Sequence, residues 1–330
     1  MSKVAILGAG AWGTALAVTI ARGGGAVVLG VRRAMQLEAM RASGENAVYL
    51  PGIELPPALE LTDDWERAVR DADTIVMAVP SRFARAAIVP IAHAIPSNAV
   101  IVSVTKGLEP DTLLTMSAML GEVAAPSSRV AVLSGPGFAA EVARGKPAAL
   151  VAAARDDALA ARVQALFAIR QLRIYRSNDM IGVELGGAIK NVIAVAAGIG
   201  DGLELGSSAR AALITRGLAE MMRLADAAGA RRETMAGLAG LGDLVLTCTG
   251  DLSRNRALGF RIARGETLTA PADGASVAEG AGNAIVIREL AARMGIEMPI
   301  VSAVCRVLYE AAPANAMVEE LLSRQLKAEF

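Results

Sequence analysis

The first 25 residues contain the pattern that most restricts how this chain folds. A short apolar run, KVAILG (3–8), leads into Gly8, Gly10 and Gly13 in the spacing GxGxxG, and an amphipathic helical pattern follows at once. Gly8 permits a tight turn, Gly10 lets a pyrophosphate approach the backbone, and Gly13 lets a helix pack closely on a strand. The helix N-terminus then faces the bound anion. This order of strand, glycine turn and helix predicts a dinucleotide-binding βαβ unit.

Further apolar runs of strand length follow the first one through the N-terminal half of the chain. They alternate with segments of helical length and lie at 26–31, 73–80, 99–105, 129–136 and 148–154. Uninterrupted apolar strands separated by helices are typical of a parallel sheet that is covered on both faces. The proline-rich residues 45–61 interrupt this alternation, and we interpret them as a largely irregular insertion. We therefore expect a Rossmann-type doubly wound α/β domain over residues 1–178.

A second domain is expected after the sheet, because 330 residues exceed the length at which a single core usually stops growing. From about residue 178 the strand pattern disappears, and helical periodicity continues to the end. Breaks in this periodicity fall near 198–206, 226–233, 238–244 and 264–280. We predict an all-helical C-terminal domain over residues 179–330.

The charge and hydropathy of the chain exclude several classes of partner. Its 33 basic and 33 acidic residues cancel, so that no overall field attracts nucleic acid or an anionic membrane. A membrane span needs a run of about 18 or more uncharged apolar residues, and the sequence has none. The most apolar segment, 181–200, contains Glu184, Lys190 and Asn191. The N-terminus has no basic region followed by a cleavable apolar segment. These features predict a cytoplasmic protein without an integral membrane segment.

Metal and disulfide chemistry are not expected. Cys248 and Cys305 lack a neighbouring cysteine or histidine at metal-ligand spacing, and two free thiols in a reducing compartment are the simplest interpretation. The single histidine, His93, lies at a predicted helix end and is interpreted as structural. A proton transfer would therefore use another type of side chain.

The choice of dinucleotide depends on the residues after the second predicted strand. A domain that prefers NAD usually has an acidic residue there, which binds the ribose hydroxyls. This chain instead reads LGVRRAM and has no acidic residue between Gly8 and Glu38. Arg32 and Arg33 could meet a 2′-phosphate, or they could be solvated arginines at the start of a helix. We predict that NADP is accepted, and the arginine pair does not exclude NAD.

One lysine lies inside a nearly apolar helical segment, ELGGAIKNVIAVAAGIG (184–200). Only five of the 33 basic residues are lysines, and arginine cannot release its proton as lysine can. In a helix Lys190 would project over Gly186 and Gly187, which we expect to leave an open pocket above its amine. An apolar surround would lower the pKa of Lys190, and the adjacent Asn191 could bind a hydroxyl. The alternative is a lysine that reaches solvent from an amphipathic helix.

Three further segments carry side chains suited to an anionic substrate. Lys106 follows a predicted strand at the carboxyl edge of the sheet, where open α/β proteins bind ligands. Ser253, Arg254 and Asn255 lie at a predicted helix start, where side-chain donors and backbone N–H groups together suit a phosphate. Asp243 could accept a hydroxyl or orient the lysine of the apolar helix. Taken alone, Lys106 could be a surface lysine, and the 253–255 cluster could be a helix cap.

These motifs together resemble the bacterial NAD(P)-dependent glycerol-3-phosphate dehydrogenase family over nearly the whole chain. The matching segments are GAGAWGTALA, ENAVYLPG, SVTKGLE, LSGPGFAAEVA, ELGGAIKNVIAVAAGIGDGL, GLGDLVLTC, LSRNR and VAEG. The resemblance implies a Rossmann domain followed by a helical domain of the 6-phosphogluconate dehydrogenase C-terminal type, and commonly a homodimer. It also implies reversible reduction of dihydroxyacetone phosphate to sn-glycerol 3-phosphate with NADP or NAD, for phospholipid biosynthesis.

The resemblance also implies roles for individual residues. Lys190 carries over as the catalytic proton donor and acceptor. The substrate positions are Lys106, Gly135, Gly137, Lys190, Asp243, Ser253, Arg254 and Asn255. The dinucleotide positions are Gly8, Gly10, Ala11, Trp12, Gly13, Arg32, Arg33, Lys106, Ala139, Arg254, Val277 and Glu279. No residue carries over as a metal ligand.

The sequence departs from the family pattern at two places. The family usually has serine or threonine at the position of Gly137, so a side-chain contact to substrate there is lost or replaced by a backbone N–H. After Glu279 the family often has a Tyr-Arg pair, whereas this chain has Ala281 and Gly282. Both changes concern affinity, and neither involves the expected acid/base residue.

Two other functions remain open from the residues alone. A β-hydroxyacid dehydrogenase also combines a Rossmann domain, a helical domain and a helix lysine, but a substrate without phosphate has little use for the 253–255 cluster. A non-catalytic dinucleotide sensor would bind cofactor without turnover, and it would leave Lys190 and its neighbouring glycines unexplained.

Overall fold

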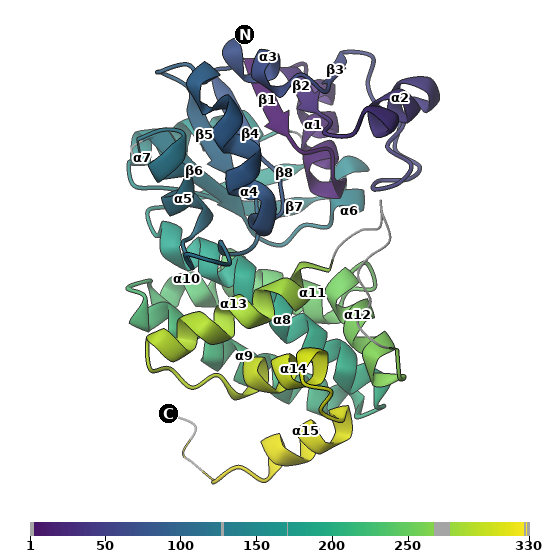
Figure 1. The fold of residues 1–330 in the computed structure, drawn as a ribbon, viewed down its shortest axis with the longest axis vertical. Helices are drawn as coiled ribbons and strands as arrows, with labels where there is room; N and C mark the ends of the chain where they lie inside the picture. Colours follow the sequence, from purple (N-terminus) through teal and green to yellow (C-terminus); the bar gives the residue numbers. More distant parts are fainter. Residues whose placement is uncertain (1–2, 127–128, 170, 267–277, 327, 329–330) are drawn as a thin grey trace.

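Figure 1 shows the computed structural model, in which a sheet domain lies above a helical domain. The structure describes residues 3–126, 129–169, 171–266, 278–326 and 328. The strands end at Ser177, and the elements that follow are all helical in the described part of the chain. The first helix of the second domain contacts two strands of the sheet, so the domains meet along it.

Eight strands form one sheet with the order β3-β2-β1-β4-β5-β6-β7-β8. Their bounds are β1 Lys3–Leu7, β2 Ala26–Gly30, β3 Leu59–Thr62, β4 Thr74–Met77, β5 Val100–Ser103, β6 Val130–Ser134, β7 Ala148–Ala154 and β8 Leu172–Ser177. Each strand predicted from an apolar run is present, within a few residues of its expected bounds. β1 is parallel to both neighbours, with Val4 opposite Val27 and Thr74. The strand order reverses at β1, and ligands bind at such a point in open α/β sheets.

The sheet differs from the predicted one in two respects. β6 and β7 are antiparallel, with Val132 opposite Ala153, so the expectation of a wholly parallel sheet was wrong. An apolar strand that is buried on both faces has the same composition in either direction, which hides its orientation. The edge strands β3 and β8 were also not predicted, and the first of them extends out of the insertion that we interpreted as irregular. Their sequences, LELT and LRIYRS, contain charged residues, as edge strands often do.

Helices cover both faces of the sheet. Their bounds are α1 Ala11–Arg22, α2 Ala34–Ser43, α3 Trp65–Arg70, α4 Ser81–Ile88, the 3₁₀ helix η1 Val89–Ala94, α5 Met116–Val123, α6 Ala139–Ala143 and α7 Asp157–Phe167. Val4 and Ile6 of β1 belong to a core cluster with α1 and α7. Ala5 and Leu7 belong to another cluster with α3, α4 and α5. Alternate side chains of a strand therefore pack on opposite faces, which confirms the doubly wound architecture.

The second domain is built around α8, Met180–Gly202. The other helices are α9 Gly206–Ala227, α10 Arg232–Ala236, the π-helix η3 Leu238–Gly242, α11 Asp243–Thr249, α12 Arg254–Ala263, α13 Glu279–Arg293, α14 Pro299–Tyr309 and α15 Ala314–Leu322. α8 contacts α9, α11, α12 and α13 and is buried over most of its length. By length and composition α8 could cross a membrane, but 89% of its most apolar window lies inside the protein. It is the central core helix of this domain.

Two sets of contacts join the domains near the carboxyl edge of the sheet. Leu108 and Leu113, in the segment after β5, are buried in the core of the helical domain. Glu184 on α8 accepts hydrogen bonds from the backbone N–H and the hydroxyl of Ser117 on α5, at 2.8 and 2.6 Å. These contacts hold the segment that contains Lys106 against the helical domain.

Candidate active site

The turn after β1 has the geometry that a dinucleotide requires. Gly8 has a φ of +114°, and a Cβ there would lie 2.6 Å from the carbonyl oxygen of Ala78. A Cβ on Gly13 would collide with the carbonyl oxygen of Gly8. A Cβ on Gly10 would meet nothing within 4 Å, and Ala11 begins α1 directly after it. The turn is therefore open in front of the helix N-terminus, where a pyrophosphate binds.

The insertion before β3 supports this turn. Nδ2 of the buried Asn46 donates hydrogen bonds to the carbonyl oxygen of Ala9 at 3.0 Å and to Oγ1 of Thr14 at 2.8 Å. Nε2 of Gln36 also donates to the Ala9 oxygen, at 2.9 Å. Asn46 belongs to the segment ENAVYLPG, but sequence reasoning assigned it no role. Its partners lie 37 and 32 residues away, beyond the reach of any local pattern.

Trp12, the second residue of α1, packs against the segment after β6. A Cβ on Gly137 would lie 3.3 Å from Cη2 of Trp12, so any larger residue there would require the indole to move slightly. Ala139 begins α6 two residues later. Within the described residues, the buried Nε1 of Trp12 has no hydrogen-bond partner.

Arg32 and Arg33 come shortly after the end of β2. Arg32 is exposed, and its guanidinium lies 5.9 Å from the ring centroid of Phe83, which lies on α4. Arg33 is the residue that precedes α2. An exposed guanidinium beside an aromatic ring suits both a phosphate and a nucleotide base. Phe83 was not predicted, because a single aromatic residue carries no sequence signal of its own.

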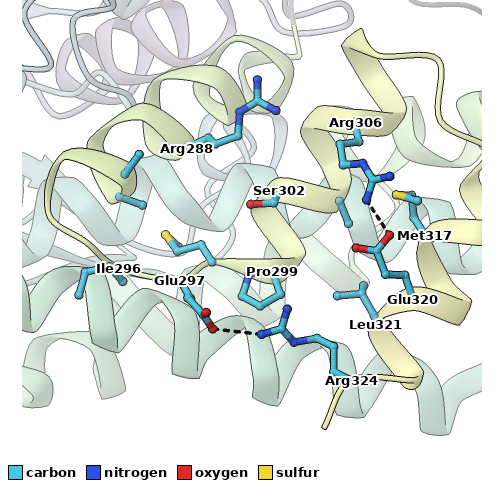
Figure 2. A pocket seen from close by; sticks show the side chains of 14 residues that line it. Arg288, Ile296, Glu297, Pro299, Ser302, Arg306, Met317, Glu320, Leu321 and Arg324 are labelled. Carbon is cyan, nitrogen blue, oxygen red and sulfur yellow. Dashed lines mark hydrogen bonds and ion pairs between the residues drawn. The ribbon is translucent and has the colours of Figure 1, made fainter.

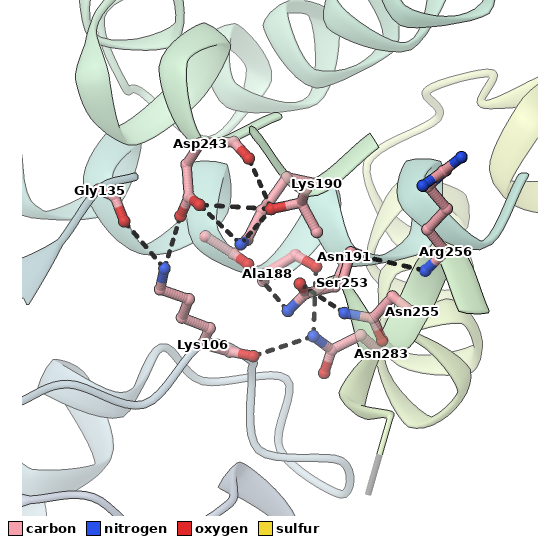
Figure 3. Close-up of polar contacts among 12 residues, drawn as sticks. Lys106, Gly135, Ala188, Lys190, Asn191, Asp243, Ser253, Asn255, Arg256 and Asn283 are labelled. Atoms are coloured by element: carbon pink, nitrogen blue, oxygen red, sulfur yellow. Dashed lines mark hydrogen bonds and ion pairs between the residues drawn. The ribbon is translucent and has the colours of Figure 1, made fainter. Parts of the chain in front are cut away.

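Two lysines and one aspartate meet at the junction of the domains (Figure 3). Nζ of Lys190 donates to Oδ1 of Asp243 and to Oγ1 of Thr247, each at 2.7 Å. Nζ of Lys106 donates to Oδ2 of Asp243 at 2.6 Å and to the carbonyl oxygen of Gly135 at 3.1 Å. One carboxylate thus binds both ammonium groups, and each lysine comes from a different domain. The site depends on contact between the sheet and the helical domain.

Burial and charge set the protonation of this group. Lys190 and Asp243 are only 6% and 1% exposed. Burial lowers the pKa of Lys190 to about 8; the charge of Asp243 opposes this shift and that of Lys106 adds to it. Burial alone would raise the pKa of Asp243, but the two lysines outweigh it and hold that pKa below its usual value. A buried amine that exchanges its proton near pH 8 beside a fixed carboxylate suits general acid/base chemistry.

Thr247 is a residue of this site that sequence reasoning missed. Its hydroxyl donates to the backbone carbonyl of Asp243 at 2.6 Å and accepts from Nζ of Lys190. Because its proton is used on the helix backbone, its lone pairs are available to the lysine. The spacing of four residues from Asp243, which places both side chains on one face of α11, was the signal that could have found it.

Gly186 and Gly187 do not leave open space above Lys190, so that expectation was wrong. A Cβ on Gly186 would lie 2.5 Å from the carbonyl oxygen of Ala239 in η3. A Cβ on Gly187 would lie 3.4 Å from Cγ of Lys106. The two glycines instead let η3 and the sheet domain approach α8 closely. This close approach brings the partners of Lys190 within reach of its amine.

Ser253 and Arg254 lie at the start of α12, as predicted. Oγ of Ser253 accepts a hydrogen bond from the backbone N–H of Arg256 at 3.2 Å, and Arg254 is the first helical residue. Burial raises the pKa of the nearby Glu279, and the charge of Arg254 opposes this rise. A guanidinium at a helix N-terminus is an arrangement that suits a phosphate.

Asn255 connects this helix start to the lysine centre. Its Nδ2 donates to Oδ1 of Asn191 at 2.9 Å, and its Oδ1 accepts from the backbone N–H of Gly280 at the same distance. Asn191 directly follows Lys190, so one side-chain hydrogen bond joins the two groups (Figure 3). The structure therefore brings together residues 106, 190, 243 and 253–255, which sequence reasoning had placed in separate segments.

The start of α13 carries the remaining expected cofactor positions. Glu279 is the first residue of α13, whereas Val277 lies outside the described residues. The carbonyl oxygen of Ala281 accepts a hydrogen bond from the hydroxyl of Tyr309 at 2.8 Å. A Cβ on Gly282 would meet nothing within 4 Å. Gly282 therefore leaves space at the start of this helix.

A separate hollow of about 260 Å³ lies between α13, α14 and α15 (Figure 2). Arg306 at its rim pairs with Glu320 at 2.6 Å, and Arg324 pairs with Glu297 at 3.1 Å. Of the described residues that line it, none was expected to bind substrate or cofactor. The hollow is thus distinct from the lysine centre.

In the described part of the chain, no cysteine or histidine hydrogen-bonds to Lys106, Lys190 or Asp243. Cys248 and Cys305 are buried free thiols. The ring of His93 is largely exposed, and its Nε2 lies 3.7 Å from a carboxylate oxygen of Glu66. Across the part of the chain that the structure describes, no group of three or more His, Cys, Asp or Glu residues could hold a metal ion.

The chain is similar to known dehydrogenases over almost its whole length. Residues 3–160 match the family model described as NAD-dependent glycerol-3-phosphate dehydrogenase N-terminus, and residues 179–319 match the corresponding C-terminus. The glycerol-3-phosphate dehydrogenase (NAD(P)+) of Geobacter sp. (strain M21) is 49% identical over 330 residues, which cover 99% of this chain and 98% of that protein. The enzyme of the same name from Thiobacillus denitrificans is 50% identical over 329 residues, with 99% and 100% covered. A crystal structure of glycerol-3-phosphate dehydrogenase from Coxiella burnetii has a TM-score of 0.93 and 39% identity and covers 98% of this chain and 99% of its own.

Proposed function

The chain belongs to the NAD-dependent glycerol-3-phosphate dehydrogenase family, and on this premise we propose that Lys190 is the acid and base of its reaction. The protein is an NAD(P)-dependent oxidoreductase, and the reaction we assign is reversible reduction of dihydroxyacetone phosphate to sn-glycerol 3-phosphate. The observation that carries the assignment of Lys190 is its buried amine, held at 2.7 Å from both Asp243 and Thr247.

The residues of the N-terminal turn fit a dinucleotide. The glycine turn is open in front of α1, and among the described residues the buried Nε1 of Trp12, the second residue of that helix, has no hydrogen-bond partner. When bound, the reduced nicotinamide supplies the hydride that the reaction needs. The residues that we propose to hold the cofactor are Gly8, Gly10, Ala11, Trp12, Gly13, Arg32, Arg33, Lys106, Ala139, Arg254 and Glu279, together with Val277.

Lys190 is proposed to move the proton at the C2 oxygen of the substrate. In reduction its ammonium donates a proton to the developing alkoxide, and in oxidation its neutral amine accepts the hydroxyl proton. Asp243 orients the amine and stabilises its charged form, while Oγ1 of Thr247 accepts a hydrogen bond from the amine. Lys106 shares the same carboxylate and adds a positive charge that stabilises negative charge on the substrate.

The phosphate end of the substrate is assigned to Ser253, Arg254 and Asn255. The guanidinium and the N-terminus of α12 supply positive charge, and the hydrogen bond from Asn255 to Asn191, which joins α12 to the lysine helix, supports this assignment. Gly135 and Gly137 follow β6 on the Lys106 side of the site, and at Gly137 only backbone groups are available for substrate.

The phosphate group of the substrate also distinguishes this reaction from that of a β-hydroxyacid dehydrogenase, whose substrate has none. The test is oxidation of NADPH by the full chain, with dihydroxyacetone phosphate and, separately, with an unphosphorylated 3-oxo acid. We expect turnover with dihydroxyacetone phosphate alone. Equal turnover of the oxo acid would favour the alternative enzyme, and binding of cofactor without turnover of either compound would indicate a sensor.

Replacing Arg254 by glutamine is expected to raise the KM for dihydroxyacetone phosphate about 10- to 100-fold. A charge-assisted hydrogen bond contributes roughly 1.5–3 kcal/mol, and the neutral amide of glutamine does not replace it. The measurement is initial rate against substrate concentration at saturating NADPH. The matched control is Arg261→Gln, on the last turn of the same helix, whose exposed side chain pairs with Glu266 at 3.3 Å. A KM for Arg254→Gln equal to that of the control would contradict the phosphate assignment.

Replacing Arg32 by alanine is expected to raise the KM for NADPH about tenfold and to leave the KM for NADH nearly unchanged. The expected loss is that of a charged contact to the 2′-phosphate, which NADH lacks. Steady-state kinetics with each cofactor provide the measurement, and Arg41→Ala, in the last turn of α2, serves as the control. Equal increases in the KM for NADPH and in the KM for NADH would show that Arg32 does not bind the 2′-phosphate.

We further propose that the enzyme acts in the cytoplasm as a homodimer and supplies glycerol 3-phosphate for phospholipid synthesis. These statements are supported by the resemblance of the chain to the bacterial family. Sedimentation of the purified chain measures the oligomeric state directly, and a monomer at micromolar concentration would contradict the dimer.

A further inference from the structure

Asn283 on α13 connects two segments that each carry a lysine of the site (Figure 3). It is 4% exposed, and its Nδ2 donates to the backbone carbonyl of Lys106 at 3.0 Å and to that of Ala188 at 3.2 Å. An amide nitrogen has two hydrogens, so both donors are used. One carbonyl belongs to the loop after β5, and the other lies on α8 two residues before Lys190.

The loop after β5 is pressed closely against this asparagine. A Cβ on Gly107 would lie 2.7 Å from Oδ1 of Asn283 and 2.6 Å from Oγ of Ser81 on α4. A side chain at position 107 would therefore require the side chains of Ser81 and Asn283, or the loop itself, to move. Glycine after Lys106 and asparagine on α13 are two parts of one close contact between the domains.

We propose that Asn283 is a positioning residue, which fixes the Lys106 loop on α8 and thereby keeps the Lys106 ammonium on Asp243 beside Lys190. This inference rests on the proposed role of Lys190. None of the residue roles assigned above explains why an amide is buried at this place. Asn283 lies 177 residues from Lys106 along the chain, so a local sequence pattern cannot reveal the contact. Asn283 acts through the position of another residue, so it is not itself a catalytic group.

Loss of this contact has a predictable effect on the charges around Lys190. The ionisable groups that face its amine are Asp243 and Cys248 from α11, Lys106 from the loop and Glu279 from α13. Of these, Lys106 lowers the pKa of Lys190, and Asp243 and Glu279 raise it. If the loop moves away, the charge of Lys106 is withdrawn and water enters, and both changes raise the pKa of Lys190.

The test is Asn283→Leu in the full chain, which keeps similar volume and removes both donors. We expect kcat for dihydroxyacetone phosphate reduction to fall about 10- to 100-fold, as for a misplaced catalytic group. We also expect the alkaline limb of the pH profile to move to higher pH. The control is Ile287→Val, one turn further along α13 and fully buried, which loosens the helix without touching the contact. Its profile should stay at the wild-type position.

A second measurement does not depend on activity. Hydrogen–deuterium exchange of the 104–110 segment should rise in Asn283→Leu and in Gly107→Ala, and remain at the wild-type level in Ile287→Val. The losses of kcat in Asn283→Leu and Gly107→Ala should be less than additive in the double variant, because both substitutions break the same contact. An unchanged exchange rate together with an unshifted pH profile would overturn the positioning role. Absence of turnover in the wild-type chain would instead refute the proposed function, and the exchange data would still decide whether the loop is held.

Discussion

Replacing Lys190 by methionine is expected to lower kcat for dihydroxyacetone phosphate reduction by about 10³-fold, because a positioned acid or base contributes roughly 10²–10⁴-fold. Methionine fills a similar volume and carries no exchangeable proton. Asp243 keeps its hydrogen bond from Lys106 at 2.6 Å, so the buried carboxylate is not left without a partner. The measurement is kcat at saturating substrate and NADPH, with thermal unfolding to verify that the variant is folded.

Two further variants separate charge from proton transfer. Lys190→Arg keeps the positive charge but cannot release the proton, so it is expected to be nearly as inactive as Lys190→Met. Lys146→Met removes an exposed lysine that pairs with Glu141 at 3.0 Å, and it is expected to have the wild-type kcat. If Lys190→Met retained a kcat within about threefold of the wild type, Lys190 could not be the acid.

The same assignment gives opposite pH dependences for the two directions of the reaction. The pKa of Lys190 is lowered to about 8, so its ammonium is lost as the pH rises through that value. Reduction uses the ammonium, and its rate should fall above about pH 8. Oxidation uses the neutral amine, and its rate should rise through the same range. Two profiles with limbs of the same sign would be inconsistent with one lysine serving both directions.

Features determined by a short segment were predictable from the sequence. The glycine turn needs only residues 3–25, and the apolar helix around Lys190 needs only its own neighbours to indicate a buried amine. The segment 253–255 was placed at a helix start, where its side-chain donors and the helix N-terminus together suit a phosphate. The structure has a strand, a turn and helices at these positions.

Contacts between distant segments were not predictable in the same way. Asp243 lies 53 residues from Lys190 and 137 from Lys106, yet one carboxylate binds both amines. Thr247 and Asn283 each make at least two hydrogen bonds in this network. The spacing of Thr247 from Asp243 is a local signal, whereas Asn283 belongs to no pattern that local spacing defines. Which side chains meet across the domain junction follows from how the helices pack, and the packing depends on the whole chain.

Gly186 and Gly187 likewise depend on distant segments, because the local sequence does not show what packs against a glycine. Sequence reasoning correctly placed both glycines beside Lys190 but assumed that a missing side chain leaves a pocket. In the structure the backbone of Ala239 occupies the space above Gly186. A glycine on a helix surface permits either an open site or a close approach, and only the neighbouring elements decide between them.

Replacing Asp243 by asparagine is expected to lower kcat for reduction at pH 7.5 by about 100-fold and to destabilise the fold by roughly 3 kcal/mol. The amide cannot balance two ammonium groups in a buried site. The charge of Asp243 raises the pKa of Lys190, so without it this pKa falls below its wild-type value of about 8. Lys190 is then largely neutral at pH 7.5 and has no proton to donate. We therefore expect the alkaline limb of the reduction profile to move to lower pH, with partial recovery of the rate on acidification.

The matched control is Asp201→Asn, which removes a carboxylate on α8 that accepts hydrogen bonds from Arg210 at 2.8 Å and Arg256 at 2.6 Å. This variant should lose comparable stability without moving the pH profile, because neither arginine exchanges its proton. Asp243→Asn and Asn283→Leu should shift that profile in opposite directions, since the first removes a negative charge near Lys190 and the second withdraws a positive one. A loss of rate in both variants with no shift in either would mean that the network only holds the fold together, and the proton would then have to come from a group other than Lys190.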